Sequence, residues 1–187
     1  MKSILILAAH PDYEVLGCGG TIAQKACDIL CVSSLSFADF SDNRMDTVSL
    51  LDITIALESL ITKHQPDTVF THHAGDLNID HRRMHEAVVT ACRPQHGHPV
   101  KTRLSFEVPS STERQLSGSA PLFSPNWFVD ISTTLNRKMV AREVYTAELR
   151  DWPHPRSRQG VEHLAHWRGA TVGVDAAEAF ILGRQLV

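Results

Sequence analysis

The residues best suited to chemistry follow the first apolar segment of the chain. His10, Asp12 and Glu14 come directly after the run Ser3 to Ala9, and a glycine-rich stretch, residues 17–20, comes next. Imidazole and carboxylate groups bind zinc at about 2.0 to 2.2 Å, and a catalytic zinc site keeps one position open for water. These residues therefore leave two interpretations open. They could form a metal site, or they could form a turn in which the Asp12 side chain caps the local backbone by a hydrogen bond.

A second polar cluster follows a later apolar segment. Asp76, Asn78, Asp80 and His81 lie between the run Thr68 to His72 and a helical pattern. Asp80 could orient a metal ligand or a water beside His81. The same pair could instead simply cap the helix that follows. Residue types alone leave both interpretations open.

The elements around these clusters predict an α/β fold. Strands are expected at Ser3–Ala9, Ser34–Phe40 and Thr68–His72, and helices at Val48–Lys63 and from about Arg82 to Cys92. The first strand is a continuous apolar run, which is typical of a strand covered on both faces. The order βαβαβ favours a parallel, doubly wound sheet, whose ligands bind at the carboxyl ends of the strands. Both polar clusters are therefore expected at one edge of the sheet.

The second half of the chain continues the same pattern. Polar stretches rich in Pro, Gly, Ser or His predict surface loops, and apolar or amphipathic stretches predict further strands and helices. We expect loops at Arg93–His98 and Pro109–Pro125, strands at Leu104–Val108 and Trp127–Ile131, and helices at Leu135–Leu149 and from Ser157 to about Arg168. A final segment, Ala176–Leu182, is expected to close the domain.

Composition predicts one domain, residues 1–187, that takes a small ligand. The chain has 187 residues, 43% of them hydrophobic, which is enough for one core. Its net charge of −3 gives no broad reason to bind nucleic acid or an anionic membrane. No apolar run approaches the about 20 residues of a membrane span, and the start does not resemble a signal peptide, so a cytoplasmic protein is expected. The cysteines lack CxxC spacing and are expected to be small buried thiols: Cys18, Cys27, Cys31 and Cys92.

Two segments resemble the signatures of a known family. The run AAHPDYEVLGCGGTIA is similar to the A-H-P-D-D-E signature and glycine-rich turn of the PIG-L superfamily, the LmbE-like zinc-dependent N-acetylglucosaminyl deacetylases. THHAGDLNIDHRRMHEA resembles the family's second signature, and the motifs at Ser41–Arg44, His154–Ser157 and Arg168–Gly169 extend the similarity along nearly the whole chain. The resemblance implies a Rossmann-like fold, with a mostly parallel sheet flanked by helices.

The resemblance also implies a site and a reaction. One Zn²⁺ per chain would be held by two histidines and an aspartate, with His10 and His81 as ligands and Asp12 as the general base that takes a proton from water. The substrate would be a small N-acetylated amino sugar, and the sequence leaves a homo-oligomer open. Behind this centre, Asp80 would support a ligand.

Two further residues are assigned by the same resemblance. Arg44 would contact the substrate or the released acetate. His154 would contact the oxyanion or the substrate, or else be a loop histidine that caps a turn.

The chain departs from the family pattern at Tyr13, where the family has the third ligand, an aspartate. A phenol with a pKa of about 10 is a poor zinc ligand at neutral pH unless the metal removes its proton. Tyr13 could bind as phenolate, Asp12 or Glu14 could take its place, or zinc occupancy could be low. The alternative function is therefore a catalytically impaired sugar-binding homologue.

The chain also departs from the family between Gly20 and Ser34. Relatives have another helix, strand and loop here, whereas in this chain Ala23–Val32 must make the whole crossover. Either a strand has been lost or the sequence omits a stretch. A third class, a nucleotide-binding domain, is suggested only by the glycines at 17–20, whose spacing does not match G-x-G-x-x-G.

Overall fold

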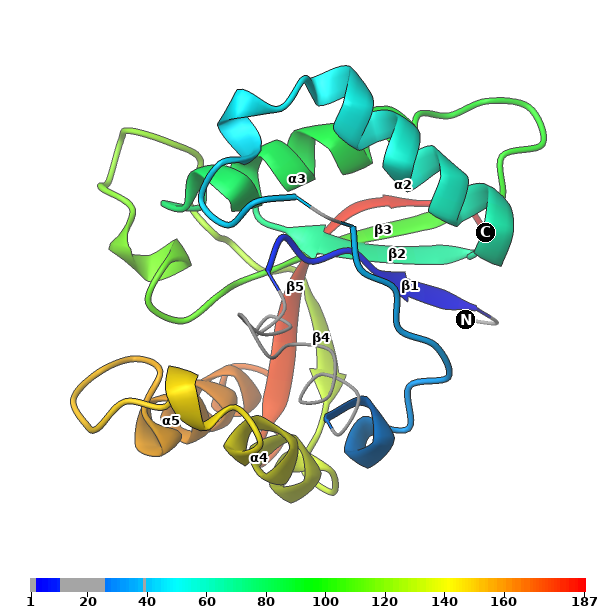
Figure 1. Cartoon of the computed structure of the whole chain (residues 1–187). Helices are drawn as coiled ribbons and strands as arrows, with labels where there is room; N and C mark the ends of the chain where they lie inside the picture. Colours follow the sequence, from blue (N-terminus) through cyan, green and yellow to red (C-terminus); the bar gives the residue numbers. More distant parts are fainter. Residues whose placement is uncertain (1–2, 11–25, 39) are drawn as a thin grey trace. The chain divides into compact units, whose positions relative to one another are not determined.

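A mixed five-stranded sheet with flanking helices forms the fold (Figure 1). The computed structural model describes residues 3–10, 26–38 and 40–187. The strand order is β1-β2-β3-β5-β4, where β1, β2 and β3 are parallel and β5 is antiparallel to β3. The predicted α/β, Rossmann-like class is confirmed, although the sheet is mixed. The strands are β1 (Ile4–Ile6), β2 (Thr68–His72), β3 (Thr102–Phe106), β4 (Trp127–Asp130) and β5 (Ala177–Gln185).

The helices match most of the sequence-based expectations. The predicted helices at Val48–Lys63 and Arg82–Cys92 are present with shifted ends, while the helix expected to run to Leu149 ends at Glu143 and is followed by a short 3₁₀ turn. The α-helices are α2 (Leu50–His64), α3 (Ile79–Ala91), α4 (Leu135–Glu143) and α5 (Arg158–Ala170), and the 3₁₀ turns are η1 (Met45–Thr47), η2 (Thr112–Arg114) and η3 (Thr146–Glu148).

The chain divides into two compact units. The first comprises Met1–Ala9, Ala38–Trp127 and Phe180–Val187, and the second His10–Phe37 and Phe128–Ala179. In the first unit, α2 and α3 lie on the same face of β1, β2 and β3 (Figure 1). In the second unit, α4 contacts α5. This unit has a small hydrophobic core that contains Ile131, Ala165 and Ala176. The predicted single domain over 1–187 stays a prediction.

The core of the first unit explains why α2 and α3 form where they do. Ser49 caps α2, because its side chain accepts hydrogen bonds from the backbone of Leu51 and Asp52. Apolar residues then recur at helical spacing and pack on the sheet. The residues that share this core include Ile53, Leu57 and Ile61 from α2, Val69 from β2, and Met84 and Val88 from α3.

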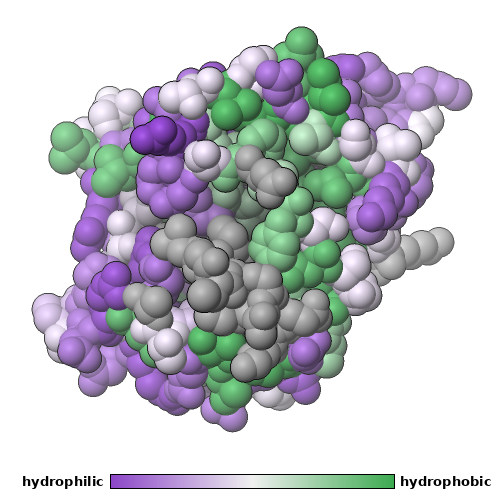
Figure 2. All heavy atoms as spheres, viewed as in Figure 1, coloured by the Kyte–Doolittle hydropathy of each residue, from purple (hydrophilic) through white to green (hydrophobic). Residues whose placement is uncertain are grey.

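Strand β1 is shorter and more exposed than predicted. It covers Ile4–Ile6 only, and the side chains of Ile4 and Ile6 are 51% and 61% exposed. The prediction that this strand is covered on both faces is wrong. In the described sheet β1 is the terminal strand, and its residues alternate, so that Leu5 and Leu7 pack on the core instead. Figure 2 shows hydrophobic surface on the side where Figure 1 draws α2 and β1.

The strand predicted at Ser34–Phe40 is also wrong for the residues that the structure describes there. Residues 34–38 and 40 form no ladder, and Phe37 is 50% exposed. The prediction fails because a strand also needs a partner for its backbone groups. Within Ala23–Val32, residues 26–30 are helical, and no described residue there is in a strand.

Two smaller expectations can be compared with the structure. Cys27 and Cys92 are buried free thiols as predicted, whereas Cys31 is exposed, and Cys18 lies outside the described residues. None of the helices in the described part of the chain is long and apolar enough to cross a bilayer. The cytoplasmic location stays a prediction.

Candidate functional site

The second polar cluster lies where β2 ends and α3 begins. Asn78 caps α3, because its side-chain oxygen accepts a hydrogen bond of 2.8 Å from the backbone of Asp80. The cap starts the helix three residues earlier than predicted and places His81 in its first turn. The imidazole of His81 is fully buried. The structure thus confirms an imidazole at this helix start, next to the end of a strand.

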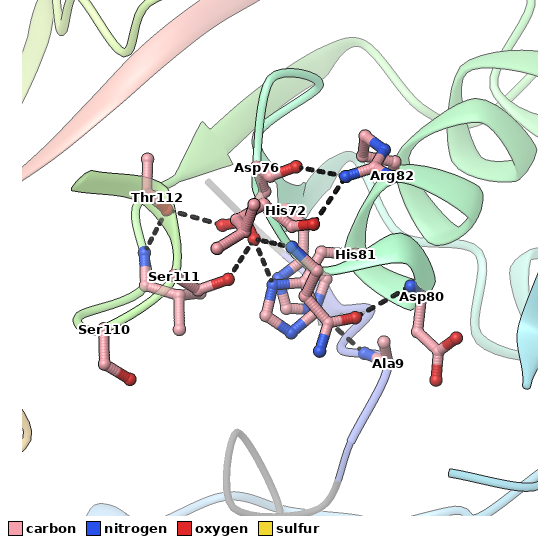
Figure 3. Close-up of polar contacts among 12 residues, drawn as sticks. Ala9, His72, Asp76, Asp80, His81, Arg82, Ser110, Ser111 and Thr112 are labelled. Carbon is pink, nitrogen blue, oxygen red and sulfur yellow. Dashed lines mark hydrogen bonds and ion pairs between the residues drawn. The ribbon is translucent and has the colours of Figure 1, made fainter. Parts of the chain in front are cut away.

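The carboxylate of Asp76 lies directly against this imidazole (Figure 3). Its Oδ1 lies 2.9 Å from His81 Nδ1, and the same oxygen accepts hydrogen bonds from the Ser111 hydroxyl and, at 2.9 Å, from the backbone of Asn78. Its Oδ2 accepts a bond of 2.6 Å from the Thr112 hydroxyl. Burial alone would raise the pKa of Asp76, but the hydrogen bond and charge of His81 and the two hydroxyls outweigh it and lower the pKa to about 2.

This pairing is the arrangement expected of a histidine that binds a metal. A carboxylate can only accept, so a proton shared between the two groups belongs to His81 Nδ1, and a neutral ring then carries its lone pair on Nε2. Metal-binding histidines usually donate their other ring nitrogen to a carboxylate, carbonyl or water. The residues present therefore fit a zinc ion bound at His81 Nε2. Sequence reasoning considered Asp76 only as a neighbour and gave the supporting role to Asp80.

Asp80 forms a hydrogen bond with the backbone near η1. Its Oδ1 accepts a hydrogen bond of 2.9 Å from the backbone of Met45, at the start of η1. A second bond of 3.2 Å joins the side chains of Asn78 and Asn43. These two bonds hold the segment 42–45 against the first turn of α3. A carboxylate oxygen of Asp42 and one of Asp80 lie within 4.8 Å of one another.

Arg44 lies in that segment, between Asn43 and the 3₁₀ turn η1. Its side chain is exposed, and its carbonyl accepts a hydrogen bond of 3.0 Å from the backbone of Thr47. The neighbouring Asn43 has a φ of 53°, in the left-handed region, and lies in a turn at residues 42–43. The role of Arg44 toward a substrate or acetate stays a prediction.

His72 binds the backbone directly before the first polar cluster. The Nε2 atom of His72 accepts a hydrogen bond of 2.9 Å from the backbone of Ala9, and its ring stacks on that of His81 with centroids 3.9 Å apart. His10 is the next residue after Ala9, so its Cα lies about 3.8 Å from that of Ala9. His72 was missed at the sequence level because it is simply the last residue of a predicted strand. Asp12 and Tyr13 lie outside the described residues, so their roles stay predictions.

The loop Pro109–Pro125 was expected at the surface, but part of it is buried. Ser111 and Thr112 are 5% and 9% exposed and hold Asp76, as described above. Further along, the Pro121 carbonyl accepts a bond of 2.8 Å from His73 Nε2. Gly75 lies directly under this loop, because an added Cβ would meet the Pro121 carbonyl and lie 2.8 Å from His73 Nε2. Polar composition misled the prediction, since these hydroxyls serve a buried carboxylate.

His154 caps a turn in the second unit. Its Nδ1 accepts a hydrogen bond of 3.0 Å from the backbone of Arg156, and its carbonyl accepts one of 2.8 Å from Ser157. Ser157 in turn caps α5 through Gly160. The capping interpretation is confirmed, and contact with an oxyanion or substrate stays a prediction.

Comparison with known proteins connects these elements to a family. Residues 23–92 match the family described as PIG-L: GlcNAc-PI de-N-acetylase. The chain is 27% identical over 146 residues, covering 59% of this chain and 76% of the other, to the uncharacterized deacetylase YaiS of Escherichia coli strain K12. The matched residues include α2, β2, the loop that carries Asp76, and α3 with His81 in its first turn.

The fold is similar to those of solved structures. One is the conserved protein TT1542 from Thermus thermophilus, with a TM-score of 0.74, 21% identity, and coverage of 100% of this chain and 97% of that one. Another is the N,N'-diacetylchitobiose deacetylase from Pyrococcus horikoshii, with a TM-score of 0.72, 17% identity, and coverage of 98% and 84%. At these identities the likenesses show the fold.

Proposed function

Because residues 23–92 match the PIG-L family of de-N-acetylases, we propose that the chain removes the acetyl group from an N-acetylglucosamine-type sugar or conjugate, with one Zn²⁺ as cofactor. The observation that carries this proposal is the buried His81 ring, whose Nδ1 is held 2.9 Å from Asp76 Oδ1. A structural histidine could be satisfied in many ways. This one has beside it the carboxylate support that is usual for a metal-binding histidine.

Each residue has a defined part in the proposed reaction. His10 and His81 would hold the ion, and Tyr13 stands in the sequence where the family has the third ligand. The bound zinc would polarise the acetyl carbonyl and increase the acidity of a water molecule. Asp12 would accept a proton from the attacking water and return it to the departing nitrogen.

The overall balance is that of amide hydrolysis. Water adds to the acetyl carbon, the C–N bond breaks, and the products are acetate and a free amine. Arg44, whose side chain is exposed beside the first turn of α3, would contact the substrate or the acetate. Asp80 would support the centre indirectly, since it holds the backbone of Met45.

Metal content and acetate release test the proposal together. Purified protein should bind one zinc per chain and release acetate from N-acetylglucosamine or N,N'-diacetylchitobiose. His81→Gln should lose both. His85→Gln is a matched control on the same helix, because His85 bonds to the His72 carbonyl and is not assigned to the metal. Full zinc occupancy with no acetate from any N-acetylated sugar conjugate would contradict the proposed deacetylase activity.

A second function is favoured by one specific observation, the tyrosine at position 13. A chain that keeps the sugar pocket but binds zinc poorly would be a sugar-binding homologue with impaired chemistry. Such a protein should bind N-acetylated sugars in a titration without consuming them. The two functions differ in whether acetate appears.

A further inference from the structure

We propose that Asp76 is the positioning residue for His81, and that Ser111 and Thr112 fix Asp76 for this task. The inference rests on the proposed function, because it assigns His81 Nε2 to a metal. It goes beyond it by naming the groups that decide which nitrogen of the ring is available. None of them belongs to the residues that the family resemblance assigned.

The first step is the geometry of the carboxylate. Asp76 and His81 have no exposed surface, and the distance from Oδ1 to Nδ1 is 2.9 Å. A buried carboxylate accepts only, so the proton of a neutral His81 must be on Nδ1. The lone pair is then on Nε2, the tautomer that a metal at Nε2 requires.

The second step is that the carboxylate cannot turn away. Oδ1 also accepts the backbone of Asn78 and the hydroxyl of Ser111, while Oδ2 accepts the hydroxyl of Thr112. The Thr112 hydroxyl accepts a bond of 2.7 Å from the backbone of Val108, so its own proton is directed to Asp76. Donors from two loops therefore fix both oxygens.

The third step is the position of the donors along the chain. Ser111 and Thr112 are 35 and 36 residues after Asp76, in a loop that follows β3. This loop also contacts the turn after β2, through Pro121 and His73. A displacement of the loop would therefore act on His81 through Asp76, without any direct contact with the metal.

The test reads the tautomer of His81 directly in the metal-free protein. Ring ¹⁵N and ¹³C chemical shifts distinguish Nδ1–H from Nε2–H, and the His81 signals are identified by their loss in His81→Gln. The wild type should show Nδ1–H. Asp76→Ala should lose this preference, whereas Asp76→Asn should keep it, because the amide oxygen can remain at the Oδ1 position. Asp80→Ala is the matched control, since it removes an adjacent buried carboxylate that bonds to Met45, and it should leave the tautomer unchanged.

Zinc affinity gives a second readout that does not depend on activity. Competition titration should show Asp76→Ala binding zinc about 10- to 100-fold more weakly than the wild type, and Asp76→Asn should lie between the two. An Nε2–H tautomer in the wild type would overturn the inference, and so would unchanged zinc affinity in Asp76→Ala. The wild-type spectrum decides the matter even if the alanine variant does not fold. Zinc binding without acetate release would instead defeat only the proposed function.

Discussion

The imidazole rings of His72 and His81 are stacked, with centroids 3.9 Å apart and an angle of 10° between their planes. His72 accepts a hydrogen bond from the backbone N–H of Ala9, and His81 Nδ1 lies 2.9 Å from Asp76 Oδ1. One buried pair of rings therefore connects the end of β1, where the first polar cluster begins, to the first turn of α3. The bond into Nε2 of His72 means that a neutral His72 carries its proton on Nδ1.

Replacing His72 should weaken this connection. His72→Phe keeps an aromatic ring against His81 but removes the acceptor for the Ala9 N–H, a loss of about 1 to 3 kcal/mol when the donor stays buried. Urea unfolding measures the change in stability, and hydrogen exchange at Ala9 localises it. If the Ala9 amide exchanged no faster in the variant, the bond would not matter in solution.

Replacing the neighbouring Thr71 should raise stability, whereas replacing His72 should lower it. Its side chain is fully buried, and its hydroxyl has no hydrogen-bond partner in the described part of the structure. Thr71→Val keeps the shape and removes the unsatisfied group, so it should raise the free energy of unfolding by about 1 kcal/mol. The same urea series measures it. A loss of stability would show that the hydroxyl has a partner in solution.

Stability should fall in mild acid because of His85. Burial lowers the pKa of His85 below 6.5, with smaller contributions in the same direction from Arg103 and His73, while the bond to the His72 carbonyl and the charge of Glu86 oppose it. A histidine with a lowered folded pKa binds protons more readily when unfolded. The contribution of His85 to stability is therefore complete at pH values above its pKa in the unfolded chain. It declines as the pH falls from that pKa toward the lower pKa of the folded protein.

The variant His85→Gln isolates this effect. Glutamine can still donate to the His72 carbonyl, which accepts from His85 Nδ1 at 2.8 Å, but it does not titrate. The free energy of unfolding, measured from pH 8 to pH 5, should decline less steeply in the variant than in the wild type. Parallel curves would mean that His85 titrates alike in both states.

The sequence predicts those parts of the site whose residues lie close together in the chain, and it misses the hydrogen bonds between residues far apart in the chain. Strand β2 and the cap of α3 follow from local patterns, because β2 is a short run of β-branched and aromatic residues and Asn78 precedes a helical period. The bonds from Ser111 and Thr112 to Asp76 span 35 and 36 residues, and no local pattern shows them. Their loop is polar in composition, which usually indicates solvent contact.

The sequence also does not predict the full strand order, because part of it depends on contacts between distant segments. A βαβ pattern predicts parallel neighbours, and β1, β2 and β3 follow it. The antiparallel pairing of β3 with β5 joins segments about 80 residues apart and depends on tertiary contacts. The segment Ser34–Phe40 is predicted to be a strand, but a local sequence does not show whether its backbone groups have a partner.

Changing Tyr13 should decide between the two functions. Tyr13→Asp restores the residue that the family has at the third ligand position, so zinc affinity should rise, and acetate release should rise with it. Zinc competition and acetate assays measure the two effects, and Tyr13→Phe serves as the control that removes only the hydroxyl. No gain from Tyr13→Asp, together with a loss from Tyr13→Phe, would indicate that the phenolate itself is a ligand.

Asn78 has two separable roles at the start of α3. Its oxygen caps the helix through Asp80, and its amide donates a bond of 3.2 Å to Asn43, next to Arg44. Asn78→Asp keeps the cap and removes the donor, whereas Asn78→Ala removes both. The alanine variant should be less stable by about 0.5 to 2 kcal/mol, and the aspartate variant should stay near the wild type.

The two variants should nevertheless share a defect at the segment 42–45. Both lose the bond to Asn43, and in Asn78→Asp an added negative charge also lies close to the acidic pair Asp42 and Asp80. If Arg44 contacts the substrate, KM should rise in both variants, while only the alanine variant unfolds at lower urea. A rise in KM that simply followed the loss of stability would show that Asn78 acts on α3 alone and that the position of Arg44 does not depend on it.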